Sequence, residues 1–129
     1  MNNECIFCKM ESGRIIDENA LAYAIIDRFP TSEGHTLIIP KRHEGDYFLL
    51  SKEEKTCCDE LLARARNRIL ASDPQVEGFN VGINIGEVAG QSVFHCHIHL
   101  IPRRKGDTPN PRGGVRHVIA HKGNYPTTP

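Results

Sequence analysis

The sequence predicts an α+β domain, in which a half-buried β-sheet is combined with one main helix. Residues 95–100 alternate polar and apolar side chains, as residues 79–85 do, and strict alternation is typical of a strand with one buried face. Two apolar runs, at 21–26 and 36–39, predict further buried strands. Residues 51–73 carry apolar side chains at helical spacing, which predicts the main helix.

The N-terminus carries a Cys-x-x-Cys pair, Cys5 and Cys8. A redox pair of this spacing normally follows a strand, and the sequence predicts no strand before it. Two cysteines supply half of a tetrahedral metal site, and histidines are the most suitable remaining ligands. A metal site, a redox pair and two buried thiols are all open at this point. The residues that follow, 9–14, predict a short helical turn that ends at Gly13.

Two polar residues flank the loop between the first two predicted strands. Asp27 follows the 21–26 run and His35 precedes the 36–39 run. From the residues alone, Asp27 is a candidate turn cap, because short acidic side chains hydrogen-bond nearby backbone in turns. His35 alone is as well explained by an ordinary, partly buried histidine.

The predicted helix begins with a capping box. Ser51 and Glu54 have the spacing in which each side chain satisfies the backbone of the other. Asp73 and Pro74 end the helix, since proline disfavours helical backbone at the preceding residue. The lysines and arginines of this segment predict a solvated face rather than a patch that binds nucleic acid. The apolar face is formed by Cys58, Leu61, Leu62, Ala65 and Ile69.

The loop after the 79–85 strand leads back to the histidine-rich stretch and has features of a ligand-binding loop. Gly86 and Gly90 permit close approach of the backbone to a ligand. Gln91 and Ser92 add hydrogen-bond donors. A Gly-Lys-Ser/Thr element is absent, so this loop is not a P-loop.

Three histidines, His95, His97 and His99, alternate with Cys96 and Ile98. Successive strand side chains point to opposite faces, so the histidines are predicted to share one face. The outer two lie about 13 Å apart at roughly 3.3 Å per residue, at the limit of what one ion with bonds of about 2.0–2.1 Å can bridge. We therefore expect the histidines to have different tasks. The alternative is a polar, solvated sheet face.

Length and composition predict one folded domain over residues 1–129. Hydrophobic residues make up 39% of the chain and charged residues 25%, which is typical of a globular protein. The formal net charge of +0 gives no general attraction to nucleic acid or to an anionic membrane. Apolar runs stay short of the ~18 residues of a membrane span, and no signal peptide is visible. The number of cysteines, five, is odd, which does not suit a complete set of disulfides. Because no secretory signal is visible either, we expect a reducing, cytoplasmic location.

The C-terminal part, 103–129, is rich in proline, glycine and basic residues and has no sustained periodicity. It predicts an irregular tail. A loosely ordered surface segment and a segment that contacts the substrate are both open.

Three ordered blocks make the sequence resemble the histidine triad (HIT) family of nucleotide hydrolases and transferases. Residues 95–101 match the His-φ-His-φ-His-φ-φ signature, with Cys96 in an apolar position, and the blocks 34–43 and 89–93 match as well. The resemblance extends from Cys5 to about residue 104. It implies a HIT-like fold, with an antiparallel sheet of about five strands, one main helix and a short N-terminal helix, and a homodimer with the sheets joined side by side.

The resemblance also implies a structural zinc ion. In HIT relatives that carry the cysteine pair, the histidine of the Pro-Lys-x-His segment and the first histidine of the triad complete the site. The corresponding ligands here are Cys5, Cys8, His43 and His95. Zinc would then fasten the N-terminal segment, 1–14, to the histidine strand, and a closed four-ligand site leaves no position for substrate. A metal-free protein with the same residues is the alternative.

For catalysis, the resemblance implies attack by His97 on the α-phosphorus of a bound nucleotide, which forms a nucleotidyl-histidine intermediate. His99 is expected to contact the phosphoryl oxygens or the leaving group, and His35 to support the triad by hydrogen bonding. A neutral imidazole is a usable nucleophile near pH 7, because its ordinary pKa is about 6.5.

For binding, the family gives Asp27 to the ribose hydroxyls of a purine nucleotide, and Asn84 and Ser92 to the phosphate. Gly90 and Gln91 join this expected nucleotide site as loop residues, together with His99. The leaving group is open between the amine of a nucleoside phosphoramidate and the second nucleotide of a dinucleoside polyphosphate.

Two other functions compete with this one. The chain could be a nucleotide-binding interaction module in which hydrolysis is incidental. It could also be a metal-dependent hydrolase in which the histidine row holds a catalytic ion.

Overall fold

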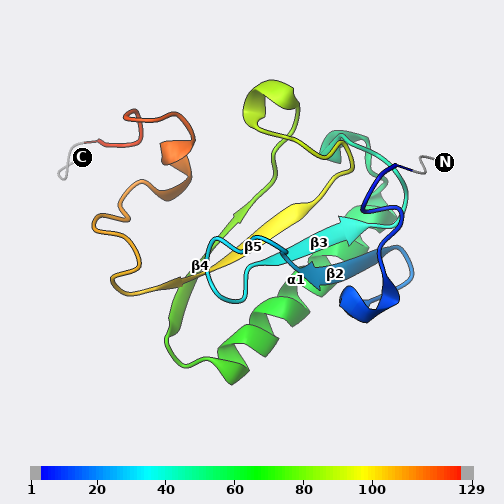
Figure 1. The fold of residues 1–129 in the computed structure, drawn as a ribbon, viewed down its shortest axis with the longest axis horizontal. Helices are drawn as coiled ribbons and strands as arrows, with labels where there is room; N and C mark the ends of the chain where they lie inside the picture. Colours follow the sequence, from blue (N-terminus) through cyan, green and yellow to red (C-terminus); the bar gives the residue numbers. More distant parts are fainter. Residues whose placement is uncertain (1–3, 126–129) are drawn as a thin grey trace.

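Five antiparallel strands form one sheet in the computed structural model, which describes residues 4–125 (Figure 1). The strands are arranged in the order β1-β2-β3-β5-β4. A single α-helix, α1 (Lys52–Ser72), connects β3 to β4. The predicted α+β class, with about five strands and one main helix, is confirmed. The strands are β1 (Ile15–Glu18), β2 (Ala22–Ile26), β3 (Thr36–Pro40), β4 (Val76–Gly82) and β5 (Ile98–Arg104).

Strands β2 and β3 occupy the middle of the sheet because their side chains are apolar on both faces. All five residues of β3 are buried, as are the first four of β2. The two strands pair over their whole length, from Ala22 opposite Pro40 to Ile26 opposite Thr36. Strand β3 also pairs with β5, so that Leu37 lies opposite His99. This register places the end of the histidine-rich stretch in the centre of the sheet.

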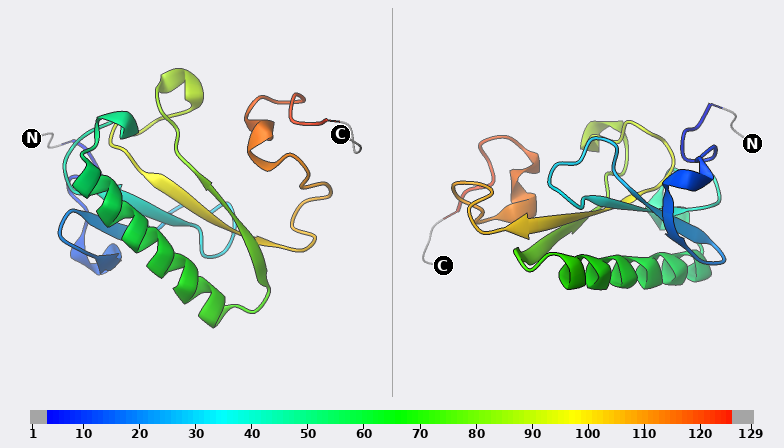
Figure 2. Two further views of the ribbon diagram at one scale, coloured as in Figure 1. Left: turned by 180° about the vertical axis from the view of Figure 1, so that it is seen from behind. Right: turned by 60° about the horizontal axis from the view of Figure 1, so that its bottom comes forward.

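Helix α1 begins and ends where the sequence predicts. Ser51 accepts a hydrogen bond from the backbone of Glu54, and the Glu54 side chain accepts one from the backbone of Ser51, which completes the capping box. The last turn is closed by the Asp73 N–H, which donates to the Ile69 carbonyl. Its apolar side packs on one face of the sheet (Figure 2). The buried residues of this core are Ala22, Ala24, Ile38, Cys58, Leu61, Ala65, Ile98 and Leu100.

The opposite face of the sheet is covered by the two ends of the chain. On the β2–β3 side, Cys5 and Phe7 of the N-terminal segment pack against Tyr23, Ile25 and Leu37. On the β4 side lies the C-terminal segment, drawn in orange in Figure 1. Because Ile98 and Leu100 point into the helix-side core, strand alternation turns His97 and His99 toward this opposite face. The candidate site therefore lies between the two ends of the chain.

Two predicted element boundaries are wrong in detail. The 79–85 strand instead spans Val76–Gly82, and its pairing with β5 has a register shift between Val76 and Gly78. Strand β5 begins only at Ile98. His95, in a bend, and His97 precede it outside the sheet. Between them, the Cys96 N–H donates to the Glu44 carbonyl in the loop after β3.

The two ends of the chain also differ from their predicted boundaries. The expected N-terminal helical turn is a 3₁₀ turn at Ser12–Arg14. At the other end, β5 continues through Arg104, so the irregular segment begins two residues later than predicted. A further 3₁₀ turn, η4 (Gly114–Val118), contacts β4. Within the described residues, no helix combines the length and apolar character that crossing a bilayer requires.

Candidate functional site

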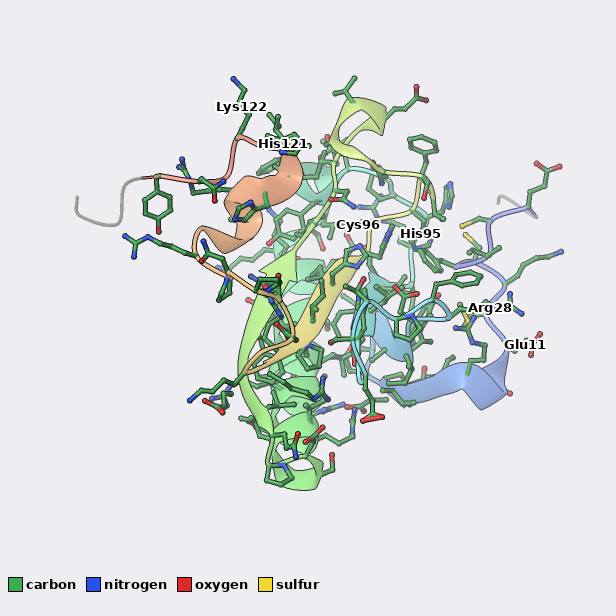
Figure 3. All side chains as sticks on the ribbon, turned by 60° about the vertical axis from the view of Figure 1, so that its left-hand side comes forward. Glu11, Arg28, His95, Cys96, His121 and Lys122 are labelled. Carbon is green, nitrogen blue, oxygen red and sulfur yellow. The ribbon has the colours of Figure 1, made fainter. Side chains whose placement is uncertain are left out.

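His95 belongs to a cluster with the two N-terminal cysteines, not to an open row of histidines. Its ring is fully buried, and Nδ1 lies 3.4 Å from Cys5 Sγ, 3.5 Å from Cys8 Sγ and 3.2 Å from His43 Nδ1 (Figure 3). Cys8 Sγ lies 3.1 Å from His43 Nδ1. On the far side of the ring, Nε2 lies 2.7 Å from the Pro40 carbonyl and donates to it. The remaining ring nitrogen, Nδ1, therefore has a lone pair directed at the cluster.

These four residues fit a tetrahedral zinc ion. Bonds of about 2.3 Å to sulfur and 2.0–2.1 Å to nitrogen, at tetrahedral angles, place a nitrogen about 3.3–3.6 Å from each neighbouring ligand atom. The observed separations of 3.1–3.5 Å agree with this geometry. The pKa of Cys8 is raised, mainly by burial and to a smaller extent by the neighbouring Cys5. A divalent cation would offset both effects by stabilising the thiolate. The site is closed, since all four positions come from the protein.

Contacts between two loops bring His43 to His95. The Gln91 side chain donates from Nε2 to the Gly45 carbonyl, and its Oε1 accepts from the Gly86 N–H. Gly45 lies against the backbone of Phe94, where a Cβ atom would come within 3.2 Å of the Phe94 carbonyl oxygen. Both polar ends of Gln91 are therefore used within the protein, and its placement explains how the loop that carries His43 is positioned.

His97 has its ring orientation fixed by the residue two positions before it. Its Nδ1 lies 2.8 Å from the His95 carbonyl and donates to it, so the proton of a neutral His97 is on Nδ1 and the lone pair is on Nε2. The ring of Phe7 packs edge-on against it, with 5.0 Å between the ring centroids. A bare imidazole nitrogen in a fixed orientation is suited to nucleophilic attack.

His35 and His99 form a hydrogen-bonded pair with defined proton positions. The backbone N–H of Thr31 donates to His35 Nδ1 at 3.0 Å, so a neutral His35 carries its proton on Nε2. That nitrogen lies 3.0 Å from His99 Nδ1 and donates to it. The proton of a neutral His99 is consequently on Nε2, which is buried and has no hydrogen-bond partner in the described part of the chain.

Burial keeps this pair neutral. Burial lowers the pKa of His99 to about 4, with the neighbouring His97 and His35 contributing in the same direction. The pKa of His35 is also lowered by burial, which outweighs the opposing effect of Asp27. His99 is therefore a neutral N–H donor at pH 7 whose acceptor would come from a ligand.

Asp27 has one carboxylate oxygen in a turn and the other directed at the histidine pair. Oδ1 accepts the Phe29 N–H at 2.9 Å, which is the turn-cap role anticipated from the sequence. Oδ2 lies 3.5 Å from His35 Nε2. Because Asp27 is partly exposed, it also faces solvent, so a cap does not prevent it from accepting hydrogen bonds from a ligand.

A cavity of about 560 Å³ joins Asp27, Ser92, His97 and His99. Volumes of 300–1,000 Å³ are typical of small-molecule sites. The cavity extends along the N-terminal segment, where apolar side chains form much of its surface. These apolar residues include Ile6, Phe7, Met10, Ile25, Phe29, Leu37 and Val93.

The predicted binding residues of the loop do not all lie in this cavity. Ser92 lines it, whereas Asn84 lines a second cavity of about 530 Å³, over the β4–β5 side of the sheet. Gly90 is exposed and adopts a left-handed backbone conformation, φ 96°, that closes the short turn before Gln91. His99 lines both cavities.

Several residues of the site escaped sequence reasoning. Phe7, Thr31 and Pro40 fix the histidine rings, in two cases through backbone atoms that carry no sequence signal. Asn80 and Val118 line the second cavity. The adjacent glycines at 113 and 114 are a sequence signal of a turn in the C-terminal segment. Both adopt a positive φ in the structure.

This sheet, with its closed Cys2His2 cluster and oriented histidines, matches a known family. The HIT domain model matches residues 9–106. The chain belongs to the histidine triad (HIT) family.

Curated relatives support the same family assignment. A HIT-like protein of Mycoplasma pneumoniae is 40% identical over 106 residues, which cover 79% of this chain and 73% of that protein. An adenosine 5′-monophosphoramidase of Schizosaccharomyces pombe is 41% identical over 103 residues, 77% of this chain and 74% of the relative. An adenylylsulfatase of Arabidopsis thaliana is 36% identical over 117 residues, 83% of this chain and 56% of the relative.

Solved structures share the fold. A zinc-bound histidine triad protein from Mycobacterium smegmatis aligns with a TM-score of 0.74 and 35% identity, over 83% of this chain and 80% of its own. A HIT family protein from Bacillus anthracis aligns with a TM-score of 0.74 and 39% identity, over 82% and 77%.

Proposed function

We propose that this protein is a nucleotide hydrolase that cleaves at the α-phosphate of purine nucleoside phosphoramidates or dinucleoside polyphosphates, through a nucleotidyl intermediate on His97. The observation that carries the proposal is the proton arrangement of two adjacent rings, with 5.1 Å between their centroids. His97 presents a lone pair on Nε2, and His99 presents an N–H that has no acceptor among residues 4–125. A nucleophile beside a hydrogen-bond donor is what transfer at phosphorus requires.

In the first step, the lone pair of His97 Nε2 forms a bond to the α-phosphorus. The bond from phosphorus to the leaving atom breaks, and its electron pair stays on that atom. A phosphate departs as an anion, and an amine departs neutral when its nitrogen is already protonated. His99 Nε2–H donates to the leaving atom or to a phosphoryl oxygen, where charge develops.

In the second step, water attacks phosphorus and the bond to His97 Nε2 breaks, with its electron pair returning to the ring. One proton of the water passes to solvent, and the nucleoside monophosphate is released. The His95 carbonyl holds His97 Nδ1–H in both steps. Two bond exchanges at one fixed nitrogen replace a single attack by water on the substrate.

The nucleoside is placed in the cavity along the N-terminal segment. Asp27 accepts the ribose hydroxyls there, Ser92 contacts the phosphate, and the apolar surface around Ile25 accommodates the base. The names of two relatives, an adenosine 5′-monophosphoramidase and an adenylylsulfatase, favour an adenine nucleotide. Asn84, Gly90 and Gln91 stay predicted members of the nucleotide site, although Gln91 spends both polar ends on the protein backbone.

Zinc has a structural role in this proposal. Cys5, Cys8, His43 and His95 would hold it, supported by their separations and by the zinc-bound relative. When bound, the ion supplies positive charge that keeps the two thiols deprotonated. It fastens the N-terminal segment to the stretch that carries His97.

A homodimer is also part of the proposal. Strand β4 is an edge of the sheet, and unpaired edges are templates for pairing with another chain. Val81 on this strand is exposed and borders a groove with Leu62, Ala63 and Phe79. Pairing of two β4 strands would join the sheets side by side.

A catalytic metal in the histidine row is a less suitable alternative. Ligand atoms of Asp27, His35 and His99 do lie within 4.8 Å of one another. However, the Thr31 N–H occupies His35 Nδ1. Nε2 of a neutral His35 then carries a proton and has no lone pair to offer a metal.

Rapid-quench mass spectrometry of the intact protein tests the proposal. Adenosine 5′-phosphoramidate or a diadenosine polyphosphate should give a transient adduct of one nucleoside monophosphate, absent from His97→Asn. Turnover without this adduct would disprove the covalent route. Nucleotide binding without turnover of either substrate class would favour the interaction module.

A further inference from the structure

We propose that Ser32 is a positioning residue for the reaction. Its hydrogen bond to strand β5 holds the Thr31 N–H against His35, and His35 in turn keeps the donor proton of His99 on Nε2. The catalytic use of that proton rests on the proposed nucleotide hydrolase function, whereas its location can be tested without turnover. Neither the sequence patterns nor the family match gives Ser32 a role.

The loop between β2 and β3 lies beside β5 (Figure 1), and Ser32 attaches it there. Strand β5 continues past the start of β3, where Thr36 lies opposite Leu100. Beyond that point the Ser32 hydroxyl donates to the Pro102 carbonyl at 2.6 Å. The side chain of Ser32 therefore ties the loop to the strand that carries His99.

A tight turn joins Ser32 to His35. The His35 N–H donates to the Ser32 carbonyl at 3.0 Å, and Gly34 between them has φ 93°. A positive φ at the third residue is the requirement of a type II turn. The turn lies so close to β5 that a Cβ atom at Gly34 would come within 3.2 Å of Pro102 Cγ. Attachment of this turn to β5 therefore fixes Thr31, the residue before it, relative to the His35 ring.

Two further contacts hold the loop independently of the Ser32 side chain. Arg104 Nη2 donates to the Glu33 carbonyl at 2.9 Å. At the base of the loop, the Asp27 N–H donates to the His35 carbonyl at 2.8 Å. Both contacts remain when the Ser32 hydroxyl is removed. Its loss should therefore loosen the preceding residue without unfolding the loop.

Two contacts determine where a neutral His35 carries its proton. The Thr31 N–H lies 3.0 Å from Nδ1 and can only donate, so it requires a lone pair there. Asp27 Oδ2, 3.5 Å from Nε2, favours the same tautomer from a longer distance. When the Thr31 N–H withdraws, Nδ1 can carry the proton, and Nε2 then accepts from His99 Nδ1. In that arrangement Nε2 of His99 is bare and cannot donate to a substrate.

Nuclear magnetic resonance of isotope-labelled histidines tests the inference in the substrate-free protein. Long-range proton–nitrogen spectra distinguish a protonated ring nitrogen from a bare one, and His35→Gln identifies the His35 signals by their absence. Wild-type His35 should show a bare Nδ1 and a protonated Nε2. In Ser32→Ala the two nitrogen signals should move toward each other, as for a mixture of tautomers, and Ser32→Thr should restore the wild-type pattern. An unchanged spectrum in Ser32→Ala would overturn the inference and leave the proton to Asp27.

Two aryl phosphoramidates of adenosine, the anilide and the para-nitroanilide, test the catalytic consequence. The nitro group withdraws the electron pair left on the departing nitrogen, so that this atom needs a donor less. In single turnovers, Ser32→Ala should form the His97 adduct about tenfold more slowly from the anilide, a part of the roughly 10²–10⁴-fold that positioned proton donors contribute. The para-nitroanilide should change by less than twofold. Glu33→Ala is the matched control, because Glu33 is exposed in the same loop and contacts Arg104 through its backbone.

A direct contact between Ser32 and the substrate is the competing explanation, since Ser32 lines the second cavity. Such a contact would slow Ser32→Ala without moving the His35 signals, and that result would overturn the inference. Equal losses on both substrates would do the same. Wild-type protein that turns over neither substrate would instead refute the proposed function, while the spectra would still decide whether Ser32 places the proton.

Discussion

At the scale of single residues, four histidines present different ring atoms because different neighbours place their protons. The Pro40 carbonyl holds Nε2–H of His95, so Nδ1 faces the cysteines. The carbonyl of His95 holds Nδ1–H of His97, so Nε2 is bare. The Thr31 N–H, acting through His35, leaves a proton on His99 Nε2. The same side chain thereby presents different atoms in different places, which is the basis of the proposed roles of metal ligand, nucleophile and donor.

The division of roles predicts different outcomes for two asparagine variants. His97→Asn should bind nucleotide and lose nearly all turnover, because no side chain is left to form the covalent bond. His99→Asn should retain the adduct but turn over about 10²–10³-fold more slowly, the usual effect of losing one donor to developing charge. Steady-state rates and adduct formation would be measured for both. Wild-type turnover in His97→Asn together with an inert His99→Asn would move the nucleophile along the chain.

Ribose recognition by Asp27 predicts coupling between the residue and the sugar. A 2′,3′-dideoxy nucleotide should bind the wild type more weakly, by about 1.5–3 kcal/mol for bonds to a charged acceptor, and should lose little further affinity with Asp27→Ala. Asp27→Asn is the control for the turn, since its amide oxygen can still accept the Phe29 N–H. Titration calorimetry gives the four affinities. Additive losses would mean that Asp27 does not touch the sugar.

At the scale of elements, the N-terminus of α1 is joined to the loop that carries His43. Arg42 donates to both carboxylate oxygens of Glu54, at 2.9 and 3.0 Å, while Glu54 also accepts the Ser51 N–H. These contacts, with the Arg42 hydrogen bond first, lower the pKa of Glu54 to about 2. A capping-box residue of the helix thus also fixes Arg42, the residue beside the proposed metal ligand His43.

The lowered pKa predicts a specific response to acid. Unfolded protein takes up a proton at Glu54 near its ordinary pKa of 4.5, and folded protein only near 2. Stabilisation by this carboxylate is therefore fully present above pH 4.5 and is lost as pH falls toward 2. Glu54→Gln should be less stable at pH 7, because a neutral amide pairs less strongly with Arg42. The loss should be at most about 1 kcal/mol, since Arg42 is half exposed and solvent screens the pair.

Denaturant unfolding of both proteins between pH 7 and pH 3 checks this prediction. The difference between wild type and Glu54→Gln should shrink as the pH falls, because only the wild type loses the stabilising charge of Glu54. Other carboxylates titrate in both proteins and cancel in the difference. A difference that stays constant would show that the charge of Glu54 does not contribute. Lys52→Gln, on the exposed side of the same turn, serves as a control that should change stability little.

At the scale of the whole molecule, local sequence patterns were sufficient to predict the core elements. The position of His95 and the second cavity depend on long-range contacts. The strands at β2 and β3 and the helix were predictable because their apolar residues and capping box act within a few positions. The exit of His95 from the sheet was not, because it depends on Cys5 and Cys8, about 90 residues away in the chain. The second cavity was also not predictable, since it needs η4 to fold back onto β4.

Zinc binding should stabilise the whole fold, because its four ligands join the N-terminal segment, the loop after β3 and the stretch before β5. A strong chelator should lower the Tm of the wild-type protein, as removal of any ligand specific to the folded state does. Cys5→Ser should start from a lower Tm and zinc content, and the chelator should shift it little. Cys57→Ser, which changes a cysteine outside the cluster, should behave like wild type.

At a temperature where the metal-free protein stays folded, phosphoramidate turnover should survive chelation, because His97 and His99 act without the ion. Loss of turnover there, with the fold intact by circular dichroism, would instead give the metal a catalytic role.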